Sequence, residues 1–438
     1  MPRRTASRPF PPAGRATART IVRVAEAAPR RACQGAAALL LALAACTAGQ
    51  ADRPADVGIP DSSGVPQAAP ATAAPDSGIA GHDSMIVPQR GDTVRAADDA
   101  LPSPLPTAAP AVRALYVNRF AAQSSRKMAK IIGFADSTEV NALVIDMKDE
   151  FGLNFASTDS TVARNAGAYG SVRNLGALLD TLKAHDILPI ARLVVFKDSV
   201  AARVNPTEVI RKADGTPWRD KGGLTWVNPY SPKIREYNLR AAEELVRLGF
   251  GEIQWDYIRF PEPYASLPPQ VFPNSNGVSK PEALADFLRE AQTRLHALGV
   301  RSTADIFGLV TTVNGPLEVG QWWEKLAPVS DVLLPMVYPS HYPRGAFGIA
   351  RPNAEPYQVV KTAIARARAR DQALGITGEH VRPYLQAFSL GQPPYGADEV
   401  RQQIQAVYDA GYQGWVLWHP GSTYDAFVPA LERTGARR

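Results

Sequence analysis

From about residue 112 onward, short runs of β-branched and aromatic residues alternate with longer amphipathic stretches. Eight of the short runs have the length and composition of buried strands: 113–118, 142–147, 188–196, 252–259, 302–307, 332–338, 383–388 and 415–418. Between them, apolar residues recur three and four positions apart, as they do in 175–182. This spacing predicts helices at 125–134, 174–185, 233–248, 281–298, 316–326, 357–374, 398–410 and 423–431.

The alternation of strand and helix is typical of βα units around a parallel sheet. Eight complete units are the number that closes a (β/α)8 TIM barrel, so the sequence predicts an α/β barrel of residues 111–435. A doubly wound open sheet with additional strands is the alternative. The absence of a glycine-rich phosphate-binding motif after the first strand argues against that alternative.

Composition separates the predicted barrel from what precedes it. Residues 46–110 consist mainly of Ala, Pro, Asp, Ser, Gly and Thr, and they offer too little apolar surface to offset the entropy of ordering. All seven tryptophans follow this stretch. We therefore expect 46–110 to be a disordered linker and the C-terminal three quarters to hold the folded mass.

Residues 1–45 have the features of an export signal. An arginine-rich start precedes a short apolar run that ends in Leu43-Ala-Ala-Cys46 and is too short to span a bilayer. This ending resembles a bacterial lipobox, which implies lipid on Cys46 and a membrane-anchored lipoprotein of the cell envelope. An ordinary secretion signal with an incidental Cys46 is the other interpretation. Because Cys33 is the one other cysteine, no disulfide is expected in the mature domain.

The formal net charge of +6 does not indicate a nucleic-acid partner, because the charge is localised. Residues 1–45 contain eight arginines against one glutamate, a net charge of +7, which leaves −1 for the rest of the chain. A nearly neutral mature domain lacks the basic surface that nucleic-acid binding needs.

Acidic residues lie where the predicted strands end, which is where barrel enzymes hold their catalytic groups. Asp256 lies between Trp255 and Tyr257 in an otherwise apolar run, and burial there is costly unless the carboxylate is paired. It could form a structural salt bridge to Arg259 or Arg192, or act in catalysis. Asp305 ends the next strand and could reach the same site. We take Asp256 and Asp305 as the candidate catalytic residues.

Further side chains near the strand ends could contact a substrate. The predicted binding residues are Asp146, Lys148, Glu150, Arg192, Tyr257, Arg259, Glu262, Tyr338, His341, Gln386 and Trp418. Aromatic side chains among them suit the apolar faces of sugar rings, although some could simply pack the barrel. The charged run after the second strand could equally be a solvated loop.

Other chemistries find little support in the sequence. The six histidines show no pairing at metal-ligand spacing, so no metal or other cofactor is predicted. There is no Gly-x-Ser-x-Gly elbow and no P-loop, which argues against an esterase and a nucleotide hydrolase.

Five segments together carry a family resemblance: VIDMKDEFG (144–152), IARLVVFKDS (190–199), IQWDYIRFP (253–261), TADIFGL (303–309) and LPMVYPSHY (334–342). As a set they resemble the glycosyl hydrolase domain of bacterial envelope proteins, which is distantly similar to α-amylase-type barrels. The resemblance covers nearly all of residues 112–431. It implies that the fourth-strand Asp256 is the nucleophile and that the fifth-strand acid, Asp305, is the proton donor.

The chain departs from the amylase pattern in carrying Asp instead of Glu on the fifth strand, so Glu150 or Glu262 could replace Asp305 as the acid. It also carries Gln386 where other glycanase barrels have a second glutamate. The leading hypothesis is a retaining glycoside hydrolase that acts on an envelope or extracellular polysaccharide. The alternatives are a non-catalytic glycan-binding or scaffolding lipoprotein and a metal-dependent polysaccharide deacetylase.

Overall fold

The computed structural model describes residues 111–433, and within them eight parallel strands form a closed barrel. The first strand pairs with both the second and the last, which completes the ring. In ring order the strands are β1 (Arg113–Val117), β2 (Ala142–Asp149), β4 (Leu188–Val194), β5 (Glu252–Asp256), β6 (Arg301–Phe307), β7 (Val332–Met336), β8 (Tyr384–Gln386) and β9 (Trp415–Trp418). The short strand β3 (Gly152–Leu153) pairs antiparallel with the end of β2.

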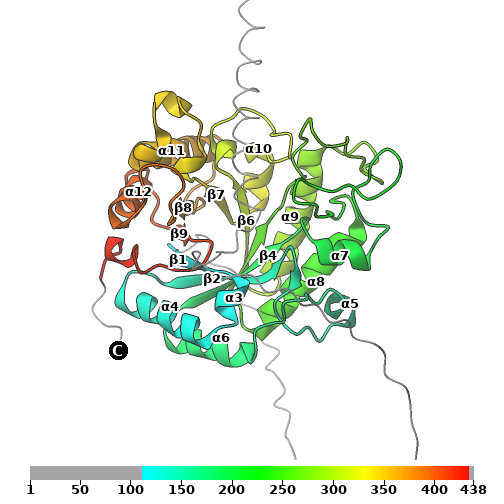
Figure 1. Ribbon diagram of the computed structural model, residues 1–438, viewed down its shortest axis with the longest axis horizontal. Coiled ribbons are helices and arrows are strands. Elements are labelled where there is room, and N and C mark those ends of the chain that lie inside the picture. Colours follow the sequence, from blue (N-terminus) through cyan, green and yellow to red (C-terminus); the bar gives the residue numbers. More distant parts are fainter. Residues whose placement is uncertain (1–110, 434–438) are drawn as a thin grey trace, which may run out of the picture. The chain divides into compact units, whose positions relative to one another are not determined.

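Helices surround the strands (Figure 1). The longer ones are α4 (Ser125–Ser137), α6 (Leu175–Ala184), α8 (Pro232–Leu248), α9 (Lys280–His296), α11 (Pro356–Ala373) and α12 (Ala397–Asp409). The shorter ones are α3 (Arg119–Ala122), α5 (Ser160–Ala163), α7 (Ser199–Val204) and α10 (Trp323–Leu326). The described residues therefore form the predicted TIM barrel, and none of their helices is long and apolar enough to cross a membrane.

Local sequence explains where these helices begin and end. In α8 the Ser231 side chain accepts a hydrogen bond from the Ile234 N–H, and Pro232 occupies the first turn, where its missing N–H costs nothing. The helix ends at Gly249, whose positive φ of 119° suits a residue without a side chain. These signals set the α8 boundaries within one residue of the predicted ones.

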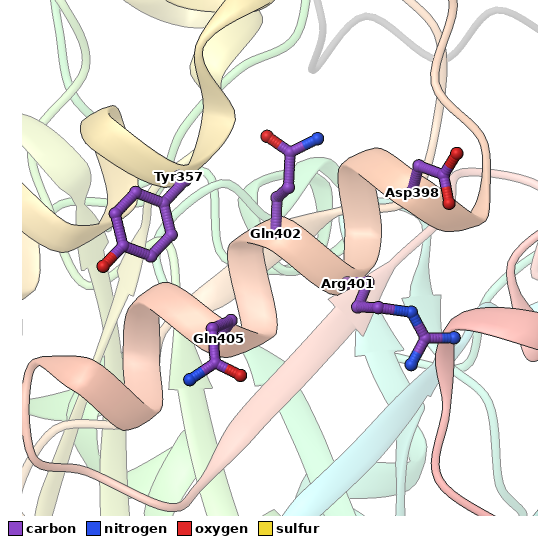
Figure 2. Close-up of a pocket in the computed structure, with 5 residues that line it drawn as sticks. All are labelled: Tyr357, Asp398, Arg401, Gln402 and Gln405. Atoms are coloured by element: carbon purple, nitrogen blue, oxygen red, sulfur yellow. The ribbon is translucent and has the colours of Figure 1, made fainter.

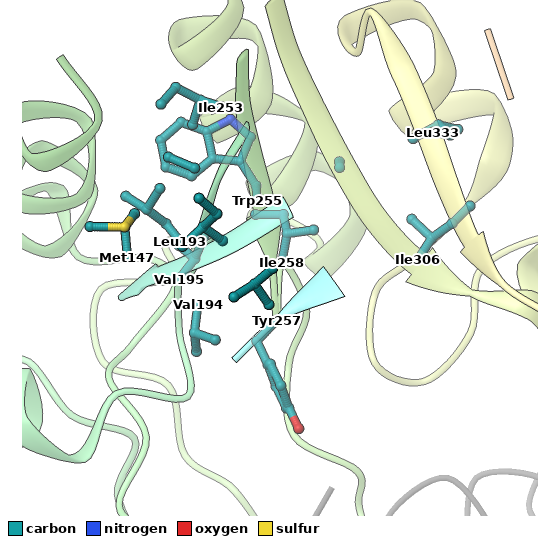
Figure 3. Close-up of a cluster of buried hydrophobic side chains, with 14 of the residues drawn as sticks. Met147, Leu193, Val194, Val195, Ile253, Trp255, Tyr257, Ile258, Ile306 and Leu333 are labelled. Atoms are coloured by element: carbon teal, nitrogen blue, oxygen red, sulfur yellow. The ribbon is translucent and has the colours of Figure 1, made fainter. Parts of the chain in front are cut away.

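Two apolar cores hold the barrel. The outer core lies between strands and helices, and Figure 3 shows part of it, with Met147, Leu193 and Trp255 gathered on the outer side of neighbouring strands. The inner core fills the barrel itself with residues such as Val144 and Leu334. Because the inner space is filled, the barrel is not a pore, and a ligand can reach only its ends.

One predicted helix forms only in its last turn, and another does not form. Residues 316–322 are not helical, and only α10 remains of the prediction, because Gly320 takes a positive φ of 89° and packs against α9 with no room for a side chain. The 423–431 stretch contains only a 3-10 turn, Val428–Ala430, with Pro429 inside it. The predicted signal segment 1–45, the predicted lipid-bearing Cys46 and the predicted linker 46–110 lie outside the described residues.

Candidate active site

Four charged side chains from four adjacent strands meet inside the barrel at the C-terminal ends of the strands. They are Asp146 of β2, Arg192 of β4, Asp256 of β5 and Asp305 of β6. The strand register brings them to similar heights, since Asp146 lies level with Arg192, and Val194 lies level with Asp256. The three aspartates are at most 6% exposed, so their charges need partners.

Arg192 provides the partner for all three aspartates. Its Nη1 forms an ion pair with Asp146, its Nη2 forms one with Asp256, and its Nε lies 3.6 Å from Asp305. Tyr116 adds a hydrogen bond of 2.5 Å from its hydroxyl to the other oxygen of Asp146. A planar guanidinium with several donors can hold more than one carboxylate in a fixed arrangement. We call these four residues, Asp146, Arg192, Asp256 and Asp305, the carboxylate cluster.

Asp305 is held by a second polar contact. The Gln254 amide nitrogen donates to both Asp305 oxygens, at 2.8 and 3.0 Å, and lies 2.6 Å from the Tyr384 hydroxyl. The Gln254 amide oxygen is buried and has no hydrogen-bond partner among the described residues. Turning the amide by 180° would bring this oxygen against Asp305, where it could accept the proton of a carboxylic acid.

Burial and neighbouring charge set the protonation of the cluster. Burial, and then the charge of Asp256, raise the pKa of Asp305 well above its usual range, although Arg192 and Gln254 act in the opposite direction. Burial also raises the pKa of Asp146, against the lowering effect of Arg192. Asp305 is therefore a carboxyl group that holds its proton to a higher pH than an ordinary aspartate does, next to Asp256, which is ion-paired with Arg192.

The backbone at Asp256 is unusual. Tyr257, the next residue, has a φ of +49°, which is rare for an aromatic residue and costs conformational energy. This turn brings the Tyr257 N–H to within 2.5 Å of an Asp256 side-chain oxygen. The strained residue thus fixes the orientation of the Asp256 carboxylate.

An aromatic wall lies beside the cluster. Tyr338 stacks on Trp418 with ring centroids 5.6 Å apart, Trp418 lies 5.9 Å from Tyr116, and Phe388 and His341 pack edge-on around Tyr338. Burial lowers the pKa of His341 to about 4, so its imidazole is neutral near pH 7. The predicted residues Tyr338, His341 and Trp418 therefore come together at the C-terminal ends of β7 and β9.

A second group of predicted residues gathers around Tyr257. Arg259 lies over the Tyr257 ring and forms an ion pair of 3.2 Å with Glu262, and both are nearly buried. Lys197, which the sequence reasoning missed, places its ammonium 4.8 Å from the centre of the same ring. Glu150 is partly exposed, and its charge raises the pKa of Lys197 and of Tyr257. The charge of Glu150 also acts on Asp146 of the cluster, whose pKa it raises.

The side chains of Lys148 and Gln386, both predicted to contact a substrate, are used in contacts within the protein. The pairing of β2 with β4 shifts by one residue between Asp146 and Lys148, a bulge that turns Lys148 away from the barrel interior. Its fully buried ammonium forms an ion pair of 2.8 Å with Asp198. Gln386 is also fully buried and uses its side chain in hydrogen bonds to the backbone of Ser340 and Phe388. We leave both out of the candidate site.

Gln254 and Tyr384 are site residues that the sequence reasoning missed. The available signal was alternation: in β5, Gln254 is two positions from Asp256 and must share its inward face. Tyr384 lies in the short strand β8 two positions before Gln386, so alternation places it on the same face as that predicted residue.

One depression on the helical layer is lined by Tyr357 of α11 and by side chains of α12 (Figure 2), and it includes none of the cluster residues. Within residues 111–433, no group of three His, Cys, Asp or Glu side chains is arranged to hold a metal ion.

Several solved structures are similar to this chain, and the first one described here supports the fold. The glycoside hydrolase domain of PgaB (BpsB) from Bordetella bronchiseptica is 17% identical, with a TM-score of 0.52, and the match covers 74% of this chain and all of that one. A hypothetical protein from Ruminiclostridium thermocellum is 32% identical over 41% of this chain and 92% of its own, with a TM-score of 0.38. The spore cortex-lytic enzyme SleL of Bacillus megaterium is 11% identical over 76% of both chains, with a TM-score of 0.46.

Comparison with families and curated proteins gives two results. No curated protein matches this chain. The model of one family, described as "Putative glycosyl hydrolase domain", matches residues 114–424, which include all of the barrel strands except the first residue of β1, and the carboxylate cluster. The chain therefore belongs to this glycosyl hydrolase domain family.

Proposed function

We propose that the barrel hydrolyses glycosidic bonds of an envelope or extracellular polysaccharide by a retaining mechanism. One observation carries the proposal: Asp256 and Asp305 contact the same guanidinium, while burial and the charge of Asp256 raise the pKa of Asp305. Two neighbouring carboxyl groups in opposite protonation states are what a glycosidase needs. Membership of a glycosyl hydrolase family supports the same reaction class.

In this mechanism Asp256 attacks the anomeric carbon while the bond to the leaving oxygen breaks. Asp305 gives its proton to that oxygen and becomes a carboxylate. A water molecule then attacks the glycosyl-enzyme, Asp305 takes the proton back, and the ester bond to Asp256 breaks. The sugar leaves with its original anomeric configuration.

Each remaining residue of the site has a positioning or binding part in the proposal. Arg192 orients Asp256 through their ion pair. Because Arg192 and the sugar both contact the Asp256 carboxylate, Arg192 must give up part of its contact when the sugar binds. Gln254 orients Asp305. The stacked rings of Tyr338 and Trp418 offer an apolar surface against which a sugar ring can pack.

A second function follows from one feature of the cluster. Arg192 holds Asp146 and Asp256 together, which is also how a glycan-binding barrel without catalysis could keep buried charges neutral. In that case the protein binds a polysaccharide and releases no product.

Hydrolysis of a polysaccharide panel by the full-length protein separates the two functions. We expect reducing ends to be released from at least one polysaccharide, and Asp256→Asn to lower the rate by a factor on the order of 10³ or more. The control is Asp136→Asn, which changes an exposed aspartate of α4, paired there with His185. Glycan binding without hydrolysis would favour the second function, and an active Asp256→Asn enzyme would overturn the mechanism.

A further inference from the structure

Three exposed aromatic side chains form a patch on the same end of the barrel as the carboxylate cluster. Phe120, Phe151 and Tyr169 are 57%, 36% and 51% exposed, and they are the only aromatic residues among the large hydrophobic side chains that are exposed in residues 111–433. The Tyr169 ring packs edge-on against both phenylalanines, with centroids 5.8 and 5.3 Å apart. We call these three residues the aromatic patch.

The patch is held rigidly from below by Arg119. This arginine is 2% exposed, donates to the Gly152 and Leu153 carbonyls at 2.9 and 3.0 Å, and forms an ion pair of 2.7 Å with Asp149. Its guanidinium also lies 5.9 Å from the centre of the Tyr169 ring. The segments that carry the three rings are therefore tied to one buried cation.

Close packing of the backbone also holds the aromatic patch in place. A side chain on Gly167 would come within 2.3 Å of the Phe151 carbonyl oxygen, so the Tyr169 loop lies directly against the turn after β2. Exposed aromatic rings on a fixed backbone lose little entropy when they bind, which is a property of binding surfaces.

A chain of hydrogen bonds connects the patch to the cluster. Gln123 donates from one amide nitrogen to the Tyr169 carbonyl at 3.2 Å and to the Asn154 side chain at 2.7 Å. Asn154 in turn donates to the backbone carbonyl of Asp146 at 2.7 Å. The loop that carries Tyr169 is thus linked by hydrogen bonds to the β2 side of the candidate active site.

We propose that the aromatic patch is a remote binding subsite, in which Phe120 and Tyr169 pack against a sugar ring of a polysaccharide whose cleavage point lies at the carboxylate cluster. This inference rests on the proposed function and extends it to a long-chain substrate. Aromatic rings pack against the C–H faces of sugars, and a subsite away from the reacting bond adds affinity for polymers alone.

Affinity electrophoresis of the full-length protein in native gels tests the subsite without depending on catalysis. The gels contain soluble starch, hydroxyethyl cellulose or glycol chitin, and suspended peptidoglycan is tested by co-sedimentation. We expect the wild-type protein to be retained by at least one polymer, and the Phe120→Ala, Tyr169→Ala double variant to bind it at least tenfold more weakly. Tyr169→Phe should restore most of the affinity in the presence of Phe120.

The matched control is the Leu248→Ala, Leu390→Ala double variant, which removes two exposed aliphatic side chains outside the patch and should bind as the wild type does. Retention in no polymer, or equal retention of the wild-type and patch variants, would overturn the subsite. Patch-dependent binding to phosphatidylglycerol vesicles instead of to polysaccharide would also overturn it and assign the rings to a lipid surface.

Kinetics separates failure of the subsite from failure of the proposed function. The patch variant should keep its kcat/KM on a short aryl glycoside and show a raised KM on the polymer. Patch-dependent binding without hydrolysis would leave the subsite standing and contradict the hydrolase. Normal polymer kinetics in the patch variant would contradict the subsite and leave the hydrolase standing.

Discussion

Asp305 must work in two protonation states, because it needs a proton at the start of the proposed reaction and none after the first step. Replacing it by Asn keeps the Gln254 contact and removes the proton. The first step then depends on the leaving group. We expect Asp305→Asn to cleave a natural glycan about 10²–10⁴-fold more slowly than the wild type and an activated aryl glycoside with much less loss. Added azide should accelerate the variant by replacing water. Equal losses on both substrates would contradict the acid role.

The pH dependence follows from the same residue. Because the pKa of Asp305 is raised by burial and by Asp256, the acid form is present below the raised pKa and disappears as the pH rises through it. The rate on a natural glycan should therefore fall on the alkaline side. The pH profile of Asp305→Asn on an aryl glycoside should lack that fall. An alkaline limb that persists in the variant would assign it to another group.

Stability should change with pH in the same direction. The ordinary value for Asp305 is 3.8 and its folded pKa is higher, so the folded state binds more protons between the two values. The contribution of Asp305 to the free energy of unfolding is therefore fully present at low pH and is lost as the pH rises. This is the opposite of the usual behaviour of an ion-paired aspartate.

At the scale of elements, the bulge in β2 decides which charges belong to the site. Strict alternation would place Asp146 and Lys148 on one face, but the extra residue turns Lys148 toward Asp198. Lys148→Met should leave Asp198 buried without its cation. We expect the free energy of unfolding to fall by about 3–5 kcal/mol in urea titrations.

The control for this prediction is Lys130→Met, which breaks an exposed ion pair with Asp425 and should cost less than about 1 kcal/mol. A Lys148→Met protein of normal stability with weakened substrate binding would restore the original expectation that Lys148 contacts a ligand.

Strand and helix positions could largely be predicted from the sequence because periodicity reports burial directly. All eight barrel strands lie within the predicted runs or one or two residues beyond them, and the capped helix α8 lies where it was expected. Prediction failed where single residues interrupt the pattern, as Gly320 does before α10 and Pro429 does near the C-terminus. Apolar spacing cannot show that a glycine has a positive φ or that a loop packs against its neighbour.

The site was predictable only in part for a related reason. Acids at strand ends pointed to Asp146, Asp256 and Asp305, which do meet at Arg192. The ion pair of Asp256 with Arg192 was one of the alternatives left open by the sequence, and it is confirmed. The contacts of Arg192 with Asp146 and Asp305, the turn at Tyr257 and the contact of Gln254 with Asp305 depend on register and backbone geometry, which a single sequence does not reveal.

At the scale of the whole molecule, we propose that the barrel is exported and tethered to a membrane through lipid on Cys46. The proposal rests on the Leu43-Ala-Ala-Cys46 pattern after an arginine-rich start. Cys46→Ser should abolish lipid attachment, so that the protein is left unprocessed or is released from the membrane fraction. Fractionation with immunoblotting measures this. Normal processing together with membrane retention in the variant would contradict the tether.

The most direct test of the central claim is to identify the residue that carries the sugar in the covalent intermediate. A 2-deoxy-2-fluoro glycoside of the sugar that the protein hydrolyses should trap the glycosyl-enzyme, since the fluorine slows both steps and the second step becomes limiting. Peptide mass spectrometry of the trapped full-length protein should then find one sugar on Asp256. A sugar on another carboxylate, or product of inverted configuration without any adduct, would contradict the account.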